Sequence, residues 1–137
     1  MDKKKFLFEY MNKRNLAVLA TIGPNETPEA AVMEFGQTQE LELIFDTLKT
    51  TRKYANLKKS PKIAFVIGWE EGDTVQYEGV ATELKGAELA TYKKIMFAKN
   101  PAFAKWENLP SMTYFKVTPK WIRYSTMDQP PWEITFS

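Results

Sequence analysis

The sequence contains no cysteine and no histidine. Without cysteine there is no disulfide framework, no thiolate zinc site and no thiol nucleophile. Without histidine the chain lacks the commonest metal ligand and the commonest general base. Metal-dependent hydrolysis and the Ser-His-Asp or Cys-His mechanisms are therefore disfavoured. If the protein is an enzyme, we expect a cofactor to carry the chemistry.

A long hydrophobic run is also missing. The chain begins MDKKKFLFEYMNKR, where charge returns within a few residues of a short apolar patch. A membrane span needs about 20 apolar residues, and a signal peptide needs a longer apolar segment, so this start predicts neither. Together with the missing cysteine, it makes the cytoplasm the expected location and gives no reason to expect a membrane partner.

The length of 137 residues fits one domain, spanning residues 1–137. The composition, 44% hydrophobic and 26% charged, is that of an ordinary globular protein rather than a disordered one. A chain of this length buries roughly 68% of its unfolded surface. We therefore expect a true core that needs neither disulfides nor a structural metal.

The net charge is only +2, but the charges are segregated along the chain. Six acids and no base occur between residues 26 and 46, six bases and no acid between residues 49 and 62, and acids dominate again over residues 63–88. A basic stretch alone is typical of a solvated helix face. The alternative is a local anion site, because concentrated positive charge attracts phosphate.

Apolar periodicity and turn residues predict a mainly β chain with short helices. Helices are expected after Asp2, over 51–59 and over 87–98, with a helical turn over 101–106. Strands are expected over 16–22, 29–35, 41–45, 62–69, 74–84, 112–117, 120–126 and 132–136, with Pro119 as a break. Strands joined by short turns are antiparallel, and closure into a barrel removes their exposed edges. We therefore expect a small antiparallel barrel with flanking helices rather than a doubly wound parallel sheet.

The segment DTLKTTRK, residues 46–53, is the strongest candidate for binding. It places threonine hydroxyls and the pair Arg52–Lys53 between the end of a strand and the start of a helix. Hydroxyls, the free N–H groups of a helix start and a guanidinium fork suit the oxygens of a phosphate. The same residues also make an ordinary helix cap with surface charge, so the segment alone leaves both interpretations open.

The order of these segments resembles the pyridoxamine 5′-phosphate oxidase-like split barrels, in particular their small, general stress protein-like members. The resemblance covers about residues 14–84 and, more loosely, the KVTPKWIRYS tail. Its most specific part is a Ser/Thr-Arg-Lys-x-x-x-Leu-x-x-x-Pro pattern, present as Thr51, Arg52, Lys53, Leu57 and Pro61. It implies a six-stranded antiparallel FMN-binding split barrel, FMN as cofactor, and a homodimer whose subunits build the site together. In such a dimer Trp121 and Trp132 would supply interface area or belong to the core of each chain.

The resemblance also implies a set of cofactor-binding residues, with no metal ligand and no assigned catalytic residue. The FMN phosphate is expected at Thr47, Thr51, Arg52 and Lys53, with Asp46 beside them as a further cofactor-binding residue. Val32 and Met33 lie on the strand whose backbone is expected to run along the flavin ring, with plain core packing as the alternative for both side chains. Thr74 and Gln76 lie on the strand that is expected to reach the cofactor of the partner subunit.

The sequence departs from the pyridoxamine 5′-phosphate oxidases themselves. Those enzymes carry an Arg-x-Val-Leu-Leu-Lys stretch whose basic residues serve the flavin and substrate phosphates, and in an ungapped alignment from Arg52 the two basic positions are Ala31 and Gly36. They also use a C-terminal Arg-x-His element, and no histidine exists here. We therefore expect an FMN-dependent oxidoreductase of unknown substrate and electron donor that does not oxidise pyridoxamine 5′-phosphate.

Three other functions remain open at this point. One is a non-catalytic flavin carrier or sensor, and another is a relative that holds a deazaflavin or heme in the same groove. The third is a nucleic-acid binder that uses the basic stretch 49–62 with Tyr54. The acidic flanks of this stretch would repel a long phosphate backbone, so we do not expect a nucleic-acid partner.

Overall fold

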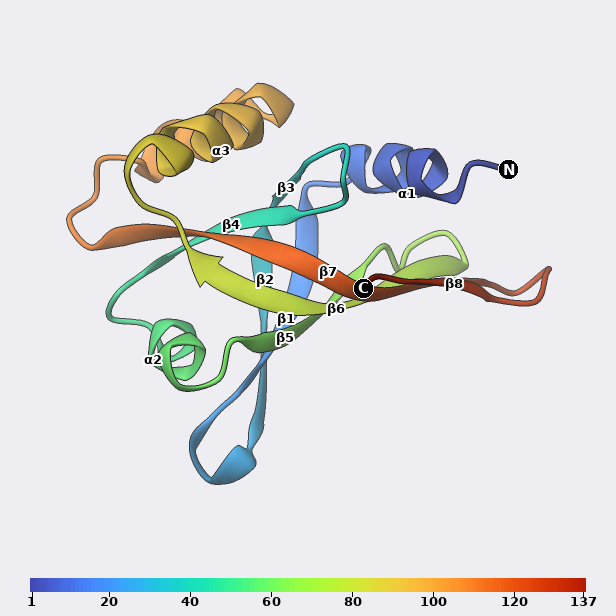
Figure 1. Ribbon diagram of the computed structural model, residues 1–137, viewed down its shortest axis with the longest axis horizontal. Coiled ribbons are helices and arrows are strands. Elements are labelled where there is room, and N and C mark those ends of the chain that lie inside the picture. The colour runs from blue at the N-terminus through green and yellow to red at the C-terminus, as the bar shows by residue number, and fades with distance from the viewer.

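Eight strands and three α-helices make up the structure, a computed structural model that describes residues 1–137 (Figure 1). The helices are α1 (Lys3–Asn12), α2 (Arg52–Lys59) and α3 (Gly86–Lys99), with two short 3₁₀ segments, η1 (Pro24–Glu26) and η2 (Pro101–Trp106). The strands are β1 (Leu16–Ile22), β2 (Pro28–Glu34), β3 (Gly36–Gln37), β4 (Leu43–Leu48), β5 (Lys62–Ile67), β6 (Asp73–Glu83), β7 (Met112–Thr126) and β8 (Trp132–Thr135). None of the helices is both long enough and apolar enough to cross a membrane.

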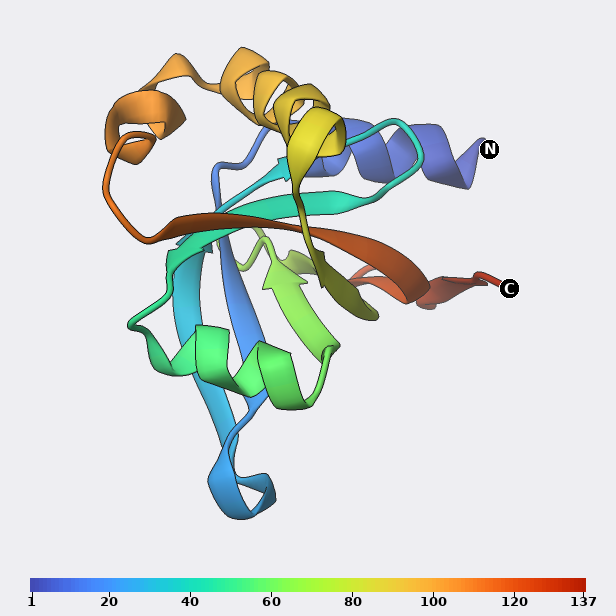
Figure 2. The same cartoon turned by 60° about the vertical axis from the view of Figure 1, so that its left-hand side comes forward.

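The strands form one antiparallel sheet in the order β2-β1-β5-β6-β7-β4-β3, and β8 pairs with the C-terminal half of β7. The sheet curls so strongly that β2 and β4 come into contact, although four strands separate them in the sheet order. Helix α2 lies across the remaining opening, against both β1 and β4 (Figure 2). The molecule is therefore a mainly β split barrel with flanking helices, as the sequence predicts.

Large aromatic side chains fill the barrel. Every second residue of β1 and β5 is buried, which separates an inner from an outer face of the sheet. On the inner side Phe45 stacks on Phe115 with ring centroids 5.3 Å apart, and Phe65 meets Phe45 at 5.9 Å in an edge-on arrangement. All three rings are at most 3% exposed. Their burial fixes the inner face of the sheet, because removal of large apolar groups from water is the main favourable term in folding.

Some details of the predicted strands are wrong. Residues 112–126 form one continuous strand, β7, although Pro119 predicted a break. Pro119 pairs with Gly79 where the register between β6 and β7 shifts, and a proline is tolerated at such an irregularity because no ladder hydrogen bond is needed there. Asp46–Leu48, expected in a loop, extend β4, and Gly36–Gln37, expected in a turn, form β3. The sheet thus has eight strands where the resemblance implies six.

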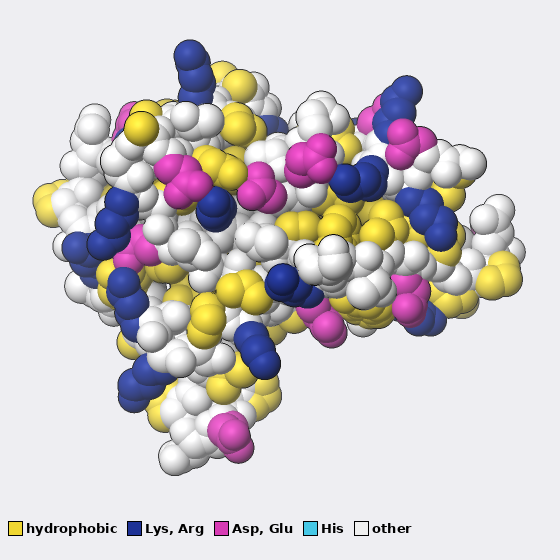
Figure 3. Space-filling view, in the orientation of Figure 1, with side chains coloured by type: hydrophobic (Ala, Val, Ile, Leu, Met, Phe, Trp, Pro, Cys, Tyr) yellow, Lys and Arg dark blue, Asp and Glu magenta, His cyan; other side chains and the backbone are white.

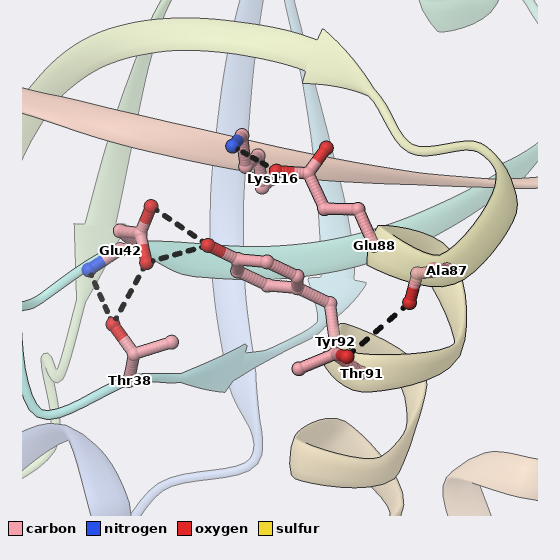
Figure 4. Close-up of polar contacts among 7 residues, drawn as sticks. All are labelled: Thr38, Glu42, Ala87, Glu88, Thr91, Tyr92 and Lys116. Atoms are coloured by element: carbon pink, nitrogen blue, oxygen red, sulfur yellow. Dashed lines mark hydrogen bonds and ion pairs between the residues drawn. The ribbon is translucent and has the colours of Figure 1, made fainter.

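Helix α3 covers β3 and β4 on the side away from α2 (Figures 1 and 2). Tyr92 donates its hydroxyl hydrogen to the Glu42 carboxylate, whose oxygens lie 2.9 and 3.0 Å away (Figure 4). At the end of the helix, the Lys99 ammonium donates to Met11 O, Phe35 O and Gln37 Oε1. Burial of this ammonium lowers the pKa of Lys99 to about 7. These contacts attach α3 to α1, β3 and the turn before β4.

Candidate functional site

The opening of the barrel lies between the free edge of β2 and strand β4, with the start of α2 beside it. Strand β2 pairs only with β1, so the sheet does not use the backbone groups along its other edge. Lys and Arg side chains gather on the same side of the molecule, at the left of Figure 3. Free N–H and C=O groups next to a helix N-terminus can hydrogen-bond a polar ring and attract an anion.

Helix α2 begins at the capping residue that the motif predicted. Thr51 Oγ1 accepts a hydrogen bond from the Tyr54 N–H at 3.3 Å and donates to the Leu48 carbonyl at 2.9 Å. Thr47 Oγ1 lies 2.7 Å from Thr51 Oγ1, and Thr47 is buried. Because the single hydroxyl hydrogen of Thr51 is directed to Leu48, Thr47 is the donor of this pair. Both hydroxyls therefore build the start of α2 and have no hydrogen left for a ligand in this arrangement.

Arg52 and Lys53 line a small hollow of about 100 Å³ between α2 and β1–β2, which we call the α2 hollow. Its other lining residues are Leu19, Thr21, Glu29, Ala30 and Ala31. Pockets for drug-sized ligands measure about 300–1,000 Å³, so this one admits a single small group and no ring system. The first N–H groups of an α-helix have no acceptor within the helix. Together with the two cationic side chains they favour an anion.

A carboxylate also lines the α2 hollow, which the sequence analysis did not anticipate. Glu29 Oε1 lies 3.5 Å from Arg52 Nε. The amide of Asn56 donates to Glu29 Oε1 at 2.9 Å and to Thr21 Oγ1 at 3.0 Å. The signal that points to Glu29 is strand alternation, because Thr21 and Glu29 are register partners on the inner face of β1 and β2.

Asp46 lies on β4 at the same opening. Burial and the negative charge of Glu34 on β2 raise the pKa of Asp46 to about 6, and the nearby Lys53 partly offsets this rise. The structure thus brings Asp46 into the electrostatic field of Lys53. A carboxyl with this pKa changes its charge close to neutral pH.

Val32 and Met33 point to opposite faces of β2, as successive residues of a strand do. Val32 is 62% exposed on the outer face, whereas Met33 is buried in the barrel core. Core packing accounts for the Met33 side chain. Any contact between Met33 and a ligand at the β2 edge must therefore involve its backbone.

Thr74 and Gln76 lie on β6, away from the α2 hollow. One row of register partners crosses the outer face of the sheet, in the order Val32, Val18, Val66 and Gln76. With strands about 4.8 Å apart, this row places Gln76 roughly 14 Å from Val32, so one chain does not bring the two together. Gln76 is exposed, and the buried Oγ1 of Thr74 has no hydrogen-bond partner.

A larger hollow of about 600 Å³ lies between α1 and the β5–β6 turn. Tyr10 and Tyr124 line it and both donate to the Asp73 carboxylate at 2.9 Å. Arg14 lies over the ring of Tyr10, 3.6 Å from its centroid. Sequence reasoning missed this cluster because its members are far apart in the chain and belong to no motif.

The structure is a split barrel of the pyridoxamine 5′-phosphate oxidase-like class. The features that define it are the curled sheet, the opening at its β2 edge and the basic start of α2. The sequence profile of pyridoxamine 5′-phosphate oxidase matches residues 4–126. The chain belongs to this family, which confirms the resemblance seen in the sequence. No curated protein matches the sequence significantly.

Several solved structures share the fold at low sequence identity. General stress protein 26 from Bacillus anthracis str. Sterne has 20% identity and a TM-score of 0.75, over 98% of this chain and 100% of that chain. The heme storage protein HutZ from Vibrio cholerae has 17% identity and a TM-score of 0.73, over 96% and 94% of the two chains. A heme binding protein from Mycobacterium smegmatis has 16% identity and a TM-score of 0.86, but this chain spans only 58% of its length. At these identities the likeness shows the fold alone.

Proposed function

We propose that the protein binds FMN at the barrel opening and acts as a flavin-dependent oxidoreductase of unidentified substrate and electron donor. The observation that carries the proposal is the juxtaposition of Arg52 and Lys53, at the start of α2, with the free edge of β2. The two cations suit the phosphate, and the edge backbone offers donors and acceptors to the polar rim of the ring. We place this activity in the cytoplasm, because a chain without cysteine makes no use of an oxidising compartment.

The α2 hollow is large enough for only one part of FMN. A volume of about 100 Å³ suits the phosphate, and the ring would lie outside it along the β2 edge, towards Glu34 and Asp46. One chain leaves a ring in that position largely uncovered, whereas cofactor sites normally bury most of their ligand. We therefore propose that a second subunit completes the site.

Bound flavin would supply the electron or hydride transfer, and the chain would supply binding and orientation. Arg52 and Lys53 hold the phosphate, and the β2 backbone orients the ring. Asp46, with a pKa of about 6, is able to hold or release a proton near neutral pH. A non-catalytic flavin carrier or sensor would share the binding residues and differ only in showing no turnover with any electron donor.

Heme is the second candidate cofactor, because two of the structures that share the fold are a heme storage and a heme binding protein. Histidine and cysteine, two common axial ligands of heme iron, are absent from this sequence, which leaves only methionine and tyrosine as axial ligands. The composition therefore favours flavin over heme. A deazaflavin would meet the same edge of β2 and is distinguished from FMN by its absorption.

Replacement of Arg52 tests the phosphate contact. The Arg52 side chain is 78% exposed, so Arg52→Ala should leave the fold intact. We expect the dissociation constant for FMN to rise about tenfold to a hundredfold, from the loss of a charge-assisted hydrogen bond worth about 1.5–3 kcal/mol. Riboflavin, which has no phosphate, should bind the parent and the variant equally. Fluorescence-quenching titrations with both flavins measure this, and an unchanged FMN affinity would remove Arg52 from the site.

Lys59→Ala is the matched control for this titration. Lys59 is an exposed base at the other end of α2, so its loss changes the net charge by the same amount without touching the α2 hollow. We expect this variant to bind FMN as the parent does. Equal weakening by both substitutions would mean that only the overall charge of α2 matters.

We also propose a homodimer formed through the outer face of β1, β2 and β5. Large apolar side chains on this face are between 38% and 62% exposed, namely Leu16, Ile22, Val32 and Val66. Ala30, Ala20 and Ala64 are register partners beside them, and such small side chains let a second sheet approach closely. An apolar sheet face without a cover is typical of an interface. A second copy seated here would bring its own Thr74 and Gln76 to this face.

Pyridoxamine 5′-phosphate is not the proposed substrate. Ala31 and Gly36 stand where the resemblance places two basic residues of the oxidases. Helix α3 packs so closely on β3 that a Cβ atom at Gly36 would lie 3.0 Å from Met96 Cα, so a lysine at this position would require α3 to shift. Steady formation of pyridoxal phosphate at about 1 per second or faster, a rate typical of enzymes, would contradict this part of the proposal.

A further inference from the structure

Glu29 is the residue that the proposed function leaves unexplained. Its carboxylate lines the same α2 hollow as Arg52 and Lys53. A negative charge therefore already lies where the proposal puts a phosphate. Like charges in a partly desolvated site repel one another, so Glu29 must affect which ligand the hollow accepts.

The fold holds the Glu29 carboxylate in place. The side chain is only 13% exposed, and it accepts a hydrogen bond of 2.9 Å from Asn56, which is itself 6% exposed and also bonded to Thr21. A Cβ atom at Gly23 would collide with this carboxylate, so the connection between β1 and β2 packs directly against it. These contacts leave Glu29 little freedom to move aside.

Arg52 is the exposed partner of the pair. Its side chain is 78% exposed, and its one ion pair is the 3.5 Å contact between Nε and Glu29 Oε1. A guanidinium that is mostly in solvent can turn from one acceptor to another at little cost. An incoming anion can therefore take Arg52 away from Glu29, but it cannot displace Glu29 itself.

We propose that Glu29 is an internal competitor for the anion at the start of α2 and sets the phosphate affinity of the site, an inference that rests on the proposed function for its ligand. A bound phosphate must take Arg52 from Glu29 and remain beside the carboxylate. The phosphate of FMN therefore gains less from Arg52 and Lys53 than two unopposed cations would give. Riboflavin is unaffected, so the site prefers FMN over riboflavin less strongly than its basic motif alone predicts.

Glu29→Gln tests this role, because glutamine keeps the size and the oxygen that accepts from Asn56 while it removes the charge. Glu26→Gln is the matched control, since Glu26 is exposed in η1 of the same β1–β2 connection and changes the net charge equally. We expect the dissociation constant for FMN to fall about tenfold in Glu29→Gln and to stay unchanged in Glu26→Gln. The affinity for riboflavin should stay unchanged in both variants.

Inorganic phosphate provides a second probe that needs no flavin. We expect phosphate to raise the melting temperature of Glu29→Gln more than that of the parent or of Glu26→Gln. Equal FMN affinities and equal phosphate shifts in the parent and Glu29→Gln would overturn the competitor role, and the proposed function would stand if Arg52→Ala still weakens FMN binding. A larger phosphate shift in Glu29→Gln, with no FMN binding by either protein, would support the competitor role and contradict the proposed function.

Discussion

Asp46 carries a clear electrostatic cost at the barrel opening. Burial and the charge of Glu34 raise its pKa from 3.8 to about 6, although Lys53 lies near enough to lower it again in part. At pH 7 the folded chain must therefore keep an ionised carboxylate where a neutral group would be more stable. Such a cost at a candidate site is often retained because a shifted pKa serves the chemistry.

Asp46→Asn should stabilise the fold at pH 7. The shift in pKa corresponds to at most about 3 kcal/mol, and partial exposure of the side chain reduces the expected gain to about 1–2 kcal/mol. A raised pKa means that the folded state binds the proton more tightly, so the cost grows as the pH rises from about 4 to 6 and vanishes at lower pH. Urea unfolding at pH 7 and pH 4 measures the difference.

Asp128→Asn, in the exposed turn between β7 and β8, is the control for this prediction. Its removal should leave the free energy of unfolding nearly unchanged at both pH values. If Asp46→Asn stabilised the protein equally at pH 7 and pH 4, the gain could not come from the ionisation of Asp46.

For individual residues, the sequence points to the basic side chains but not to their partners. Arg52 and Lys53, the basic pair of the Thr-Arg-Lys pattern, line the α2 hollow. The mutual hydrogen bond of Thr47 and Thr51 depends on their rotamers, which spacing does not define. Glu29 meets Arg52 only because α2 folds over the start of β2, so no local pattern could reveal that pair.

Helix α2 is the element that presents the candidate site, and its start depends on one hydroxyl. Thr51 caps the helix by accepting the Tyr54 N–H and is also the partner of Thr47. Loss of a threonine cap usually costs about 0.5–2 kcal/mol, because a backbone N–H loses its acceptor. The orientation of Arg52 follows from this cap, since Arg52 is the first residue of the helix.

Thr51→Ala should lower the free energy of unfolding by about 1–2 kcal/mol. This is the upper part of the usual range for a lost cap, because Thr47 also loses its hydrogen-bond partner. Thr51→Ser, which keeps the hydroxyl, should retain most of the stability. Thr50→Ala is the control, because Thr50 is exposed and does not cap the helix. Denaturant unfolding of the three variants measures these differences, and an equal loss in Thr50→Ala would show that the cap contributes nothing.

Among the helices and strands, local signals predict some bounds well and miss others. Strand β1 was expected over 16–22 and spans Leu16–Ile22, and α2 was expected over 51–59 and spans Arg52–Lys59. In both cases the signals are local: a β-rich run, a threonine cap and a following proline. The extension of β4 through Leu48 depends instead on pairing with Met112 of β7. Such long-range pairing does not affect the apolar periodicity of either segment. For the same reason, the sequence wrongly predicts a strand break at Pro119.

In the whole molecule an apolar sheet face and the free edge of β2 are both uncovered. Association of two copies through β1, β2 and β5 would cover both the apolar face and the free edge. Val66 lies in the middle of the exposed row, between Val18 and Gln76. Trp132 is not available for this face, because it packs against Phe6 and Tyr124 of its own chain.

Val66→Asp should therefore convert a dimer into a monomer. A charge in the centre of an apolar interface is desolvated without a partner, which strongly disfavours association. Sedimentation at micromolar concentration should give about twice 15.9 kDa for the parent and 15.9 kDa for the variant. Thr135→Asp, at an exposed position of β8, is the control and should remain dimeric. A parent protein that sediments only as a 15.9 kDa species would contradict the proposed dimer.

The visible absorption of the purified protein, alone and after titration with FMN, is the decisive test of FMN binding at the barrel opening. We expect flavin bands and saturation near one FMN per chain, because each chain has one α2 hollow beside one free β2 edge. A Soret band in place of flavin bands would show that heme occupies the opening. A colourless protein that also fails to bind added FMN would contradict the proposed FMN site.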